Sequence, residues 1–218
     1  MKALISVFKK EKVVEFAAAL KRLGVEVVAT EGTARVLSEN GVAVTKVSEF
    51  TGFQELLGLG AGGGAGGGAG GGARGSAGGS GKVKTLHPRI HAAIATAEIG
   101  IVAVNLLPLE FSGEGVERVS VEREGVEREG VEPLGGMDIG GVALLRSGIK
   151  NFEEVAVVVN PARYDAVVEE LAAAEEGRLS RATKLELARE ASKYLLAYGA
   201  EIDKILRREK KDKYREEK

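Results

Sequence analysis

Three turns rich in glycine and hydroxyl side chains follow apolar segments of strand length, and each contains groups that bind anions. They lie at residues 6–10 (SVFKK), 30–33 (TEGT) and 138–141 (DIGG). Helix starts present N–H groups with a partial positive charge, and nearby hydroxyl and ammonium groups add donors. Helix capping by Ser and Thr alone is the other explanation of TEGT. The predicted phosphate pocket contains Ser6, Lys10, Thr30 and Thr33.

A fourth candidate for chemistry is the string KTLHP at residues 84–88. A lysine in such a turn provides a cation that neutralises a developing oxyanion. Its residues also have ordinary explanations, because a lone lysine is normally solvated and a histidine before proline is often a turn residue. The string therefore indicates a functional site only in combination with the other three turns.

The apolar pattern predicts the elements that position these turns. Strands are expected at residues 3–7, 26–29, 43–47, 99–105 and 154–159. Helices are expected at residues 11–23, 33–40, 51–57 (capped by Thr51), 87–96, 140–149, 161–174 and from 181 towards the C-terminus. This alternation predicts an α/β fold with a mostly parallel sheet flanked by helices, plus C-terminal helices. Ligands of such sheets bind outside the carboxyl ends of the strands.

Two segments of low complexity interrupt this pattern. Fifteen of the 24 residues at 58–81 are glycine, and VEREG occurs twice within residues 112–136. Such segments bury few side chains and cost much ordering entropy, so we expect a flexible insert and a loop. The predicted organisation is one domain at residues 1–205, followed by a charged tail at 206–218.

Composition limits the classes of function. The chain has 218 residues, 31 basic and 32 acidic side chains, and a net charge of −1, which gives no support to nucleic-acid or membrane binding. The absence of cysteine excludes disulfides and thiolate chemistry. Two histidines suggest no metal cluster, and no apolar run approaches the roughly 20 residues of a membrane span. We expect a cytoplasmic protein without a metal.

Taken together, these strings resemble the inosine monophosphate (IMP) cyclohydrolase domain of the bifunctional purine-synthesis enzyme. The similar strings are Ser6-Val7 with Lys10, TEGT, KVKTLHPRIH at 82–91, and DIGGV at 138–142 with LLR at 144–146 and Lys150-Asn151. They occur in the family's order and extend over residues 1–205, outside the two low-complexity segments. The resemblance implies a three-layer methylglyoxal-synthase-like fold, a homodimer, a purine ribotide substrate and a separate transformylase. It also implies ring closure to IMP with loss of water and no cofactor.

The resemblance assigns roles to individual residues as well. Lys84, Asp138 and Lys150 match residues assigned to catalysis, with Lys84 at the oxyanion or leaving hydroxyl and Asp138 at the attacking amide. The candidate residues for binding substrate and phosphate are Ser6, Lys10, Thr30, Gly32, Thr33, Lys82, Thr85, Asn105, Ile139, Gly140 and Gly141.

One departure from the family pattern leaves two other functions open. The family has Asn-Leu-Tyr-Pro-Phe where this chain has NLLPL, so Leu107 stands in the place of a tyrosine that is a catalytic candidate. This favours a non-catalytic nucleotide-binding module, and ATEGTA at 29–34 also resembles the regulatory domain of carbamoyl-phosphate synthase. Lys84, Asp138 and Lys150 together favour the enzyme. Methylglyoxal synthase shares the fold, but KTLHP and DIGG are not its strings.

Overall fold

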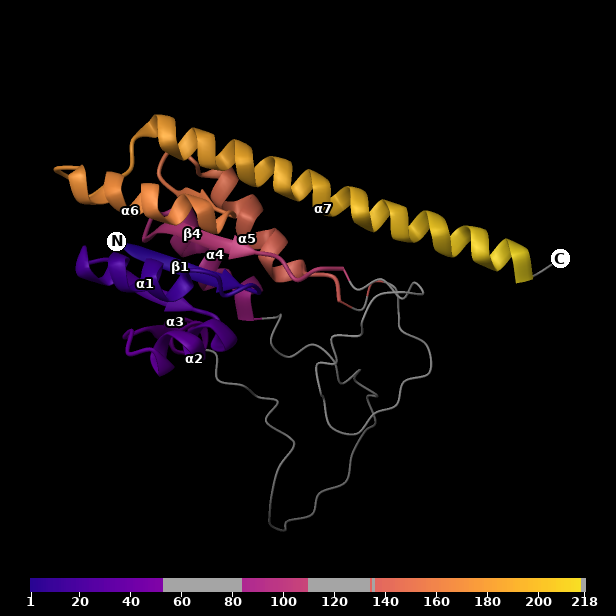
Figure 1. Ribbon diagram of the computed structural model, residues 1–218, viewed down its shortest axis with the longest axis horizontal. Helices are drawn as coiled ribbons and strands as arrows, with labels where there is room; N and C mark the ends of the chain where they lie inside the picture. The colour runs from indigo at the N-terminus through magenta and orange to yellow at the C-terminus, as the bar shows by residue number, and fades with distance from the viewer. Residues whose placement is uncertain (53–83, 110–133, 135, 217–218) are drawn as a thin grey trace, which may run out of the picture.

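The computed structural model describes residues 1–52, 84–109, 134 and 136–216 (Figure 1). The side chains of Lys84 and of residues beyond 208 are outside this description. The whole glycine-rich insert, Lys82 and most of the VEREG segment also lie outside the described residues, so the predictions about them stay predictions.

Five parallel strands form one sheet. They are β1 (Lys2–Val7), β2 (Glu26–Ala29), β3 (Thr45–Lys46), β4 (Ile99–Asn105) and β5 (Ala156–Val158), in the spatial order β3-β2-β1-β4-β5. Ile5 pairs with Ala29 on one side and with Ala103 on the other. The strand order reverses between β1 and β4, and this switch point is where open α/β sheets bind ligands.

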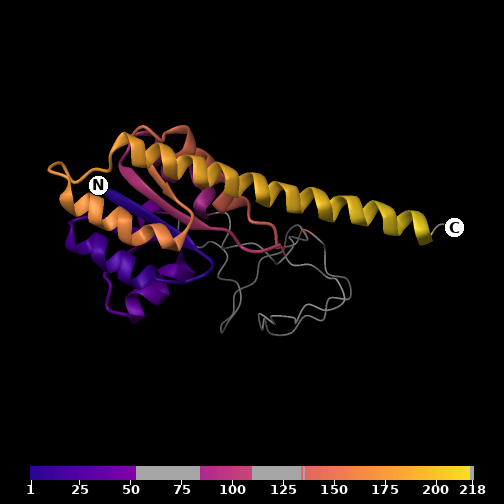
Figure 2. The same cartoon turned by 45° about the horizontal axis from the view of Figure 1, so that its top comes forward.

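Helices cover both faces of the sheet (Figures 1 and 2). The hydrophobic core on one face contains side chains of α1 (Val13–Arg22), α2 (Glu31–Glu39) and α6 (Tyr164–Ala173). The core on the other face contains side chains of α3 (Val47–Thr51), α4 (Pro88–Ala95), α5 (Ile139–Lys150) and α7 (Arg181–Glu216). Two short 3₁₀ helices, η1 (Lys84–Leu86) and η2 (Pro161–Arg163), precede α4 and α6. The predicted three-layer α/β architecture is confirmed.

Alternation along the strands explains why two cores form. In β1, Ala3 and Ile5 pack into the first core and Leu4 into the second, and all three side chains are fully buried. Successive strand residues point to opposite faces. A parallel sheet with helices on both faces therefore needs apolar residues at nearly every strand position, as ALISV and IGIVAVN have.

One local prediction is wrong, and a second is not tested. The third strand comprises only Thr45–Lys46 instead of residues 43–47, because Val47 already begins α3, where the Lys46 N–H donates to Glu49 Oε2 at 3.1 Å. Thr51 ends α3, where its hydroxyl donates to the Val47 carbonyl at 2.8 Å, and its predicted role as a helix cap stays a prediction. The rest of the helix predicted up to residue 57 lies outside the described residues.

The C-terminal helix starts where Ser180 predicted it. The Thr183 N–H donates to Ser180 Oγ at 3.2 Å, which satisfies a donor of the first turn. α7 packs against β5 and α5 and then extends past the carboxyl edge of the sheet (Figures 1 and 2). The charged residues predicted as a tail continue the same helix to Glu216.

Candidate functional site

Four predicted phosphate-binding side chains meet at the carboxyl ends of β1 and β2. Thr33, which is fully buried, lies at their centre. Lys10 Nζ donates to Thr33 Oγ1 at 3.2 Å, and Thr30 Oγ1 lies 3.4 Å from both Thr33 Oγ1 and Ser6 Oγ. Thr33 Oγ1 also donates to the Val7 carbonyl at 3.3 Å, which ties α2 to the end of β1. We call Ser6, Lys10, Thr30 and Thr33 the anion cluster.

Lys10 is the one cationic member of the anion cluster. Burial lowers the pKa of Lys10 below its usual value, and the nearby Arg35 charge acts in the same direction. A bound anion would relieve both effects, because it favours the charged ammonium. The cluster lies at the N-terminus of α2, whose first turn contains Gly32. A Cβ added to Gly32 would meet open space, so any contribution of this residue to binding comes from its N–H group.

Asn105, at the end of β4, holds the turn that carries Lys10. Its Oδ1 accepts the N–H groups of Phe8 at 2.6 Å and Lys9 at 2.8 Å, and its Nδ2 donates to the Lys9 carbonyl at 3.0 Å. These bonds bridge the switch point between β1 and β4. Since the amide already bonds to this backbone, the geometry supports positioning of the turn more than the predicted contact with substrate.

Asp138 is the N-cap of α5 and joins two segments of backbone. Its Oδ1 accepts the Gly141 N–H at 2.8 Å, and its Oδ2 accepts the Leu107 N–H at 3.3 Å. A Cβ at Gly141 would lie 2.6 Å from Leu106 Cδ2 and 2.8 Å from Asp138 Oδ2, so only glycine fits there. Glycine in DIGG thus serves close packing, while Ile139 and Gly140 place N–H groups in the first turn of α5.

The KTLHP string lies beside this helix. Lys84–Leu86 form η1, which contacts α5, α3 and α4, and Thr85 is buried at 5% exposure. His87 caps α4, because its Nδ1 accepts the Arg89 N–H at 3.1 Å. The Arg89 guanidinium lies 4.8 Å from the centre of the Phe50 ring, which ties α4 to α3. The 3₁₀ turn that begins at Lys84 is therefore held against α5.

Lys150 is the one predicted catalytic residue that the fold separates from the rest. It is exposed at the last position of α5, whereas Asp138 caps the first turn. A rise of about 1.5 Å per residue places the two ends of this 12-residue helix roughly 18 Å apart. Lys150 therefore lies near the amino edge of the sheet, and its catalytic role stays a prediction that the geometry of this chain does not support.

Two tyrosines of α7 reach the candidate site and were missed in the sequence. Tyr194 Oη accepts the Leu106 N–H at 2.9 Å, and Tyr198 Oη accepts the Asp138 N–H at 2.8 Å. Burial raises the pKa of Tyr198 above its usual value. Their spacing of four residues on a helix was the available signal, because it puts both rings on one face.

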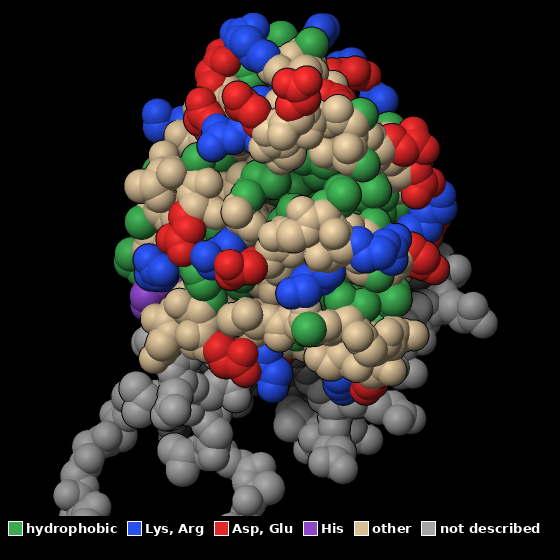
Figure 3. Space-filling view, turned by 90° about the vertical axis from the view of Figure 1, so that its left-hand side faces the viewer, with side chains coloured by type: hydrophobic (Ala, Val, Ile, Leu, Met, Phe, Trp, Pro, Cys, Tyr) green, Lys and Arg blue, Asp and Glu red, His purple; other side chains and the backbone are tan. Residues whose placement is uncertain are grey.

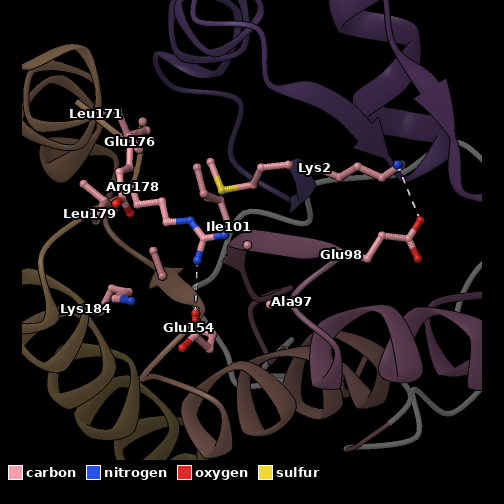
Figure 4. Close-up of a pocket in the computed structure, with 14 residues that line it drawn as sticks. Lys2, Ala97, Glu98, Ile101, Glu154, Leu171, Glu176, Arg178, Leu179 and Lys184 are labelled. Carbon is pink, nitrogen blue, oxygen red and sulfur yellow. Dashed lines mark ion pairs between the residues drawn. The ribbon is translucent and has the colours of Figure 1, made fainter. Parts of the chain in front are cut away.

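A cavity of about 390 Å³ lies at the opposite edge of the sheet (Figure 4). Its polar walls are ion pairs at the surface, such as Arg178 with Glu154 at 3.5 Å and Lys2 with Glu98 at 3.4 Å. Figure 3 shows this end of the molecule, where acidic and basic side chains are interspersed around a hollow with apolar walls. None of the predicted site residues lines the cavity. We therefore place the candidate site at the carboxyl edge.

Comparison with known proteins identifies the family of the chain. The family described as "MGS-like domain" matches residues 12–132, and "AICARFT/IMPCHase bienzyme" matches residues 148–218. "Bifunctional purine biosynthesis protein PurH" of Persephonella marina (strain DSM 14350 / EX-H1) is 35% identical over 228 residues, covering 94% of this chain and 36% of that protein. The chain thus spans about a third of the relative's length.

A solved structure is similar over nearly the whole of both chains. "Crystal structure of ForH" is 28% identical with a TM-score of 0.65, and the match covers 94% of this chain and 98% of that one. Within the described residues, no helix combines the length and apolar character needed to cross a membrane. The predicted methylglyoxal-synthase-like fold is confirmed by the first family match. The chain belongs to the MGS-like domain family and is a relative of the bifunctional purine biosynthesis proteins.

Proposed function

We propose that the chain is an IMP cyclohydrolase of purine biosynthesis. In this reaction the carboxamide nitrogen of the formylated aminoimidazole carboxamide ribotide attacks the formyl carbon. A ring C–N bond forms, the formyl oxygen becomes a hydroxyl, and that hydroxyl leaves as water. The family matches support a role in purine biosynthesis, and the carboxyl edge of the sheet supports this particular chemistry.

The observation that carries the proposal is the arrangement along this edge. The anion cluster lies at β1 and β2, and Asp138 lies beyond β4 at the start of α5. Neighbouring strands are about 4.8 Å apart, so β2 and β4 are separated by roughly 10 Å. A molecule with a phosphate at one end and reacting groups at the other fits such a separation.

The reacting groups would meet complementary groups at the start of α5. The Asp138 carboxylate orients the carboxamide and accepts a proton from its nitrogen during attack. The N–H groups of Ile139 and Gly140 stabilise negative charge that develops on the formyl oxygen, since they belong to the first turn of a helix. Lys84, which begins the 3₁₀ turn held against α5, supplies a cation for the same oxygen.

A second function has one specific observation in its favour. Leu107 has no hydroxyl, and its N–H bonds to Asp138 Oδ2, so this position offers the ligand only an apolar side chain. A nucleotide-binding module without catalysis would need the anion cluster but no catalytic side chain at position 107. The two functions differ in turnover, not in binding.

The test is conversion of the formylated ribotide to IMP, followed by absorbance with the purified chain. We expect turnover, and we expect Lys84→Ala to lower kcat by about 100-fold or more while changing the affinity for the ribotide far less. Lys21→Ala is the matched control, because Lys21 lies in the last turn of α1 at the amino edge. Binding without turnover would favour the module, and equal losses of affinity and rate would make Lys84 only a binding residue.

A further inference from the structure

The hydroxyl groups of Tyr194 and Tyr198 reach the reacting end of the candidate site from α7. Tyr198 bonds to the N–H of Asp138, whose carboxylate bonds to the N–H of Leu107. Asp138 therefore joins Tyr198, through its backbone N–H, to the backbone of the position where the family has its tyrosine, through its carboxylate. Tyr194 bonds instead to Leu106, whose side chain is buried at 4% exposure.

The Tyr198 hydroxyl has a proton left to donate. A phenol donates one hydrogen bond and accepts others, and Tyr198 Oη uses its acceptor capacity on the Asp138 N–H. No residue in the described part of the chain accepts a bond from this hydroxyl. The side chain is partly buried at the surface of the site, and burial raises its pKa above the usual value, so the phenol stays protonated at neutral pH.

We propose that Tyr198 is a catalytic residue that supplies, from α7, the phenol that position 107 lacks. Its proton is donated to the formyl oxygen as the carboxamide nitrogen bonds to the formyl carbon and loses a proton to Asp138. The resulting hydroxyl leaves as water with the proton that Asp138 accepted. The formamide nitrogen gives its hydrogen to the Tyr198 phenolate as the ring double bond forms, which restores both side chains. The inference rests on the proposed cyclohydrolase function.

Tyr198 has this role and Tyr194 does not, because of what each hydroxyl faces. The Asp138 backbone begins α5, whose first residue, Ile139, has a side chain that is 52% exposed. The Tyr198 hydroxyl therefore lies beside the start of α5, which bears the N–H groups of the candidate site. Both tyrosine rings pack against the second core, but the Tyr194 hydroxyl bonds next to a buried leucine, which suits a structural role.

The experiment compares the full chain with Tyr198→Phe, which removes only the hydroxyl. Tyr164→Phe is the matched control, because Tyr164 stacks on Phe16 at 4.0 Å in the core on the other face of the sheet. We expect Tyr198→Phe to lower kcat by about 100-fold or more and to change KM by less than about threefold. Tyr164→Phe should keep the wild-type kcat. Circular dichroism during heating establishes that each variant is folded.

A second variant separates chemistry from helix capping. Adding Leu107→Tyr to Tyr198→Phe restores a phenol beside Asp138 without restoring the bond to the Asp138 N–H. Recovery of kcat by about tenfold or more supports the inference. A folded double variant as slow as Tyr198→Phe would show that the hydroxyl acts only through the start of α5, which overturns it.

Two further outcomes are distinguishable. If the wild-type chain turns over and Tyr198→Phe keeps its full kcat, the inference fails and the proposed function stands. If the folded wild-type chain binds the ribotide but forms no IMP, the proposed function fails, and the inference fails with it.

Discussion

The carboxyl edge of the sheet has two sides that are built differently. On the side of β1 and β2, the anion cluster consists of hydroxyl and ammonium groups from residues close to their strands, bonded to one another over 3.2–3.4 Å. On the side of β4 and α5, which we call the reaction side (Leu107, Asp138 and Tyr198), the groups come from three distant segments. These groups are joined through backbone N–H groups. The first side is suited to binding an anion, and the second to positioning the reacting groups.

This difference predicts different consequences of substitution. Changes in the anion cluster should weaken binding with little effect on the chemical step, because a phosphate remote from the reacting atoms contributes equally to ground and transition states. Changes on the reaction side should lower kcat. The following predictions test this division.

The largest effect is expected for Asp138→Asn. Asparagine is as good an N-cap as aspartate, so the bond to the Gly141 N–H persists, while the negative charge and the bond to Leu107 are lost. We expect kcat to fall by about 100-fold or more. The loss of one hydrogen bond should lower Tm by about 2–4 °C. Steady-state kinetics measure kcat, and calorimetry measures Tm. A large rise in KM at constant kcat would contradict the division between a binding side and a reaction side.

A smaller effect, on stability, should distinguish two glycines. Gly141→Ala forces a Cβ to within 2.6 Å of Leu106 Cδ2 and should destabilise the fold by about 1–3 kcal/mol. Gly32→Ala, at the start of α2, meets open space and should stabilise it by about 0.4–1 kcal/mol. Urea unfolding measures both changes. Equal destabilisation by the two substitutions would show that the two sides are packed alike.

The smallest effect concerns pH and the anion cluster. Burial and Arg35 lower the pKa of Lys10 from its usual 10.5, so the ammonium is lost before that pH is reached. Ribotide affinity should therefore fall several-fold as the pH rises from neutral towards about 10.5. In the same window the unfolded chain binds more protons than the folded chain, so the stability of the unliganded protein should rise.

Calorimetric titration and thermal melting across this range measure the two opposite trends. In Lys10→Met both pH dependences should be weaker, whereas Lys21→Met should keep them. An affinity that is constant over this range would show that Lys10 does not bind the phosphate.

Much of the anion cluster could be predicted because its residues are local to their strands. Ser6 lies at the end of β1 and Lys10 just after it, and Thr30 and Thr33 follow β2. A parallel sheet brings the ends of neighbouring strands together without further information. Asp138 as the N-cap of α5 was predictable in the same way, from DIGG ahead of an apolar run. The separation of Lys150 from Asp138 was also available in the sequence, since both belong to one predicted helix.

The short third strand and the role of Asn105 show where local patterns fail. The apolar run at residues 43–47 fits a strand, but the helical turn of α3 takes Val47 into the second core. Asn105 ends a strand, as a ligand-binding residue would, yet its amide bonds to the backbone of Phe8 and Lys9, nearly 100 residues earlier. Sequence position alone cannot distinguish a polar side chain that faces a ligand from one that holds a loop.

The sequence by itself determined the strands, most helices and the anion cluster, because apolar periodicity and residues adjacent to strand ends are local properties. Only the tertiary structure decided which groups complete the reaction side. Tyr198 lies 60 residues beyond Asp138, and it reaches that residue because α7 packs across β5 and α5. That packing depends on the shape of the second core, which is a property of the folded chain as a whole.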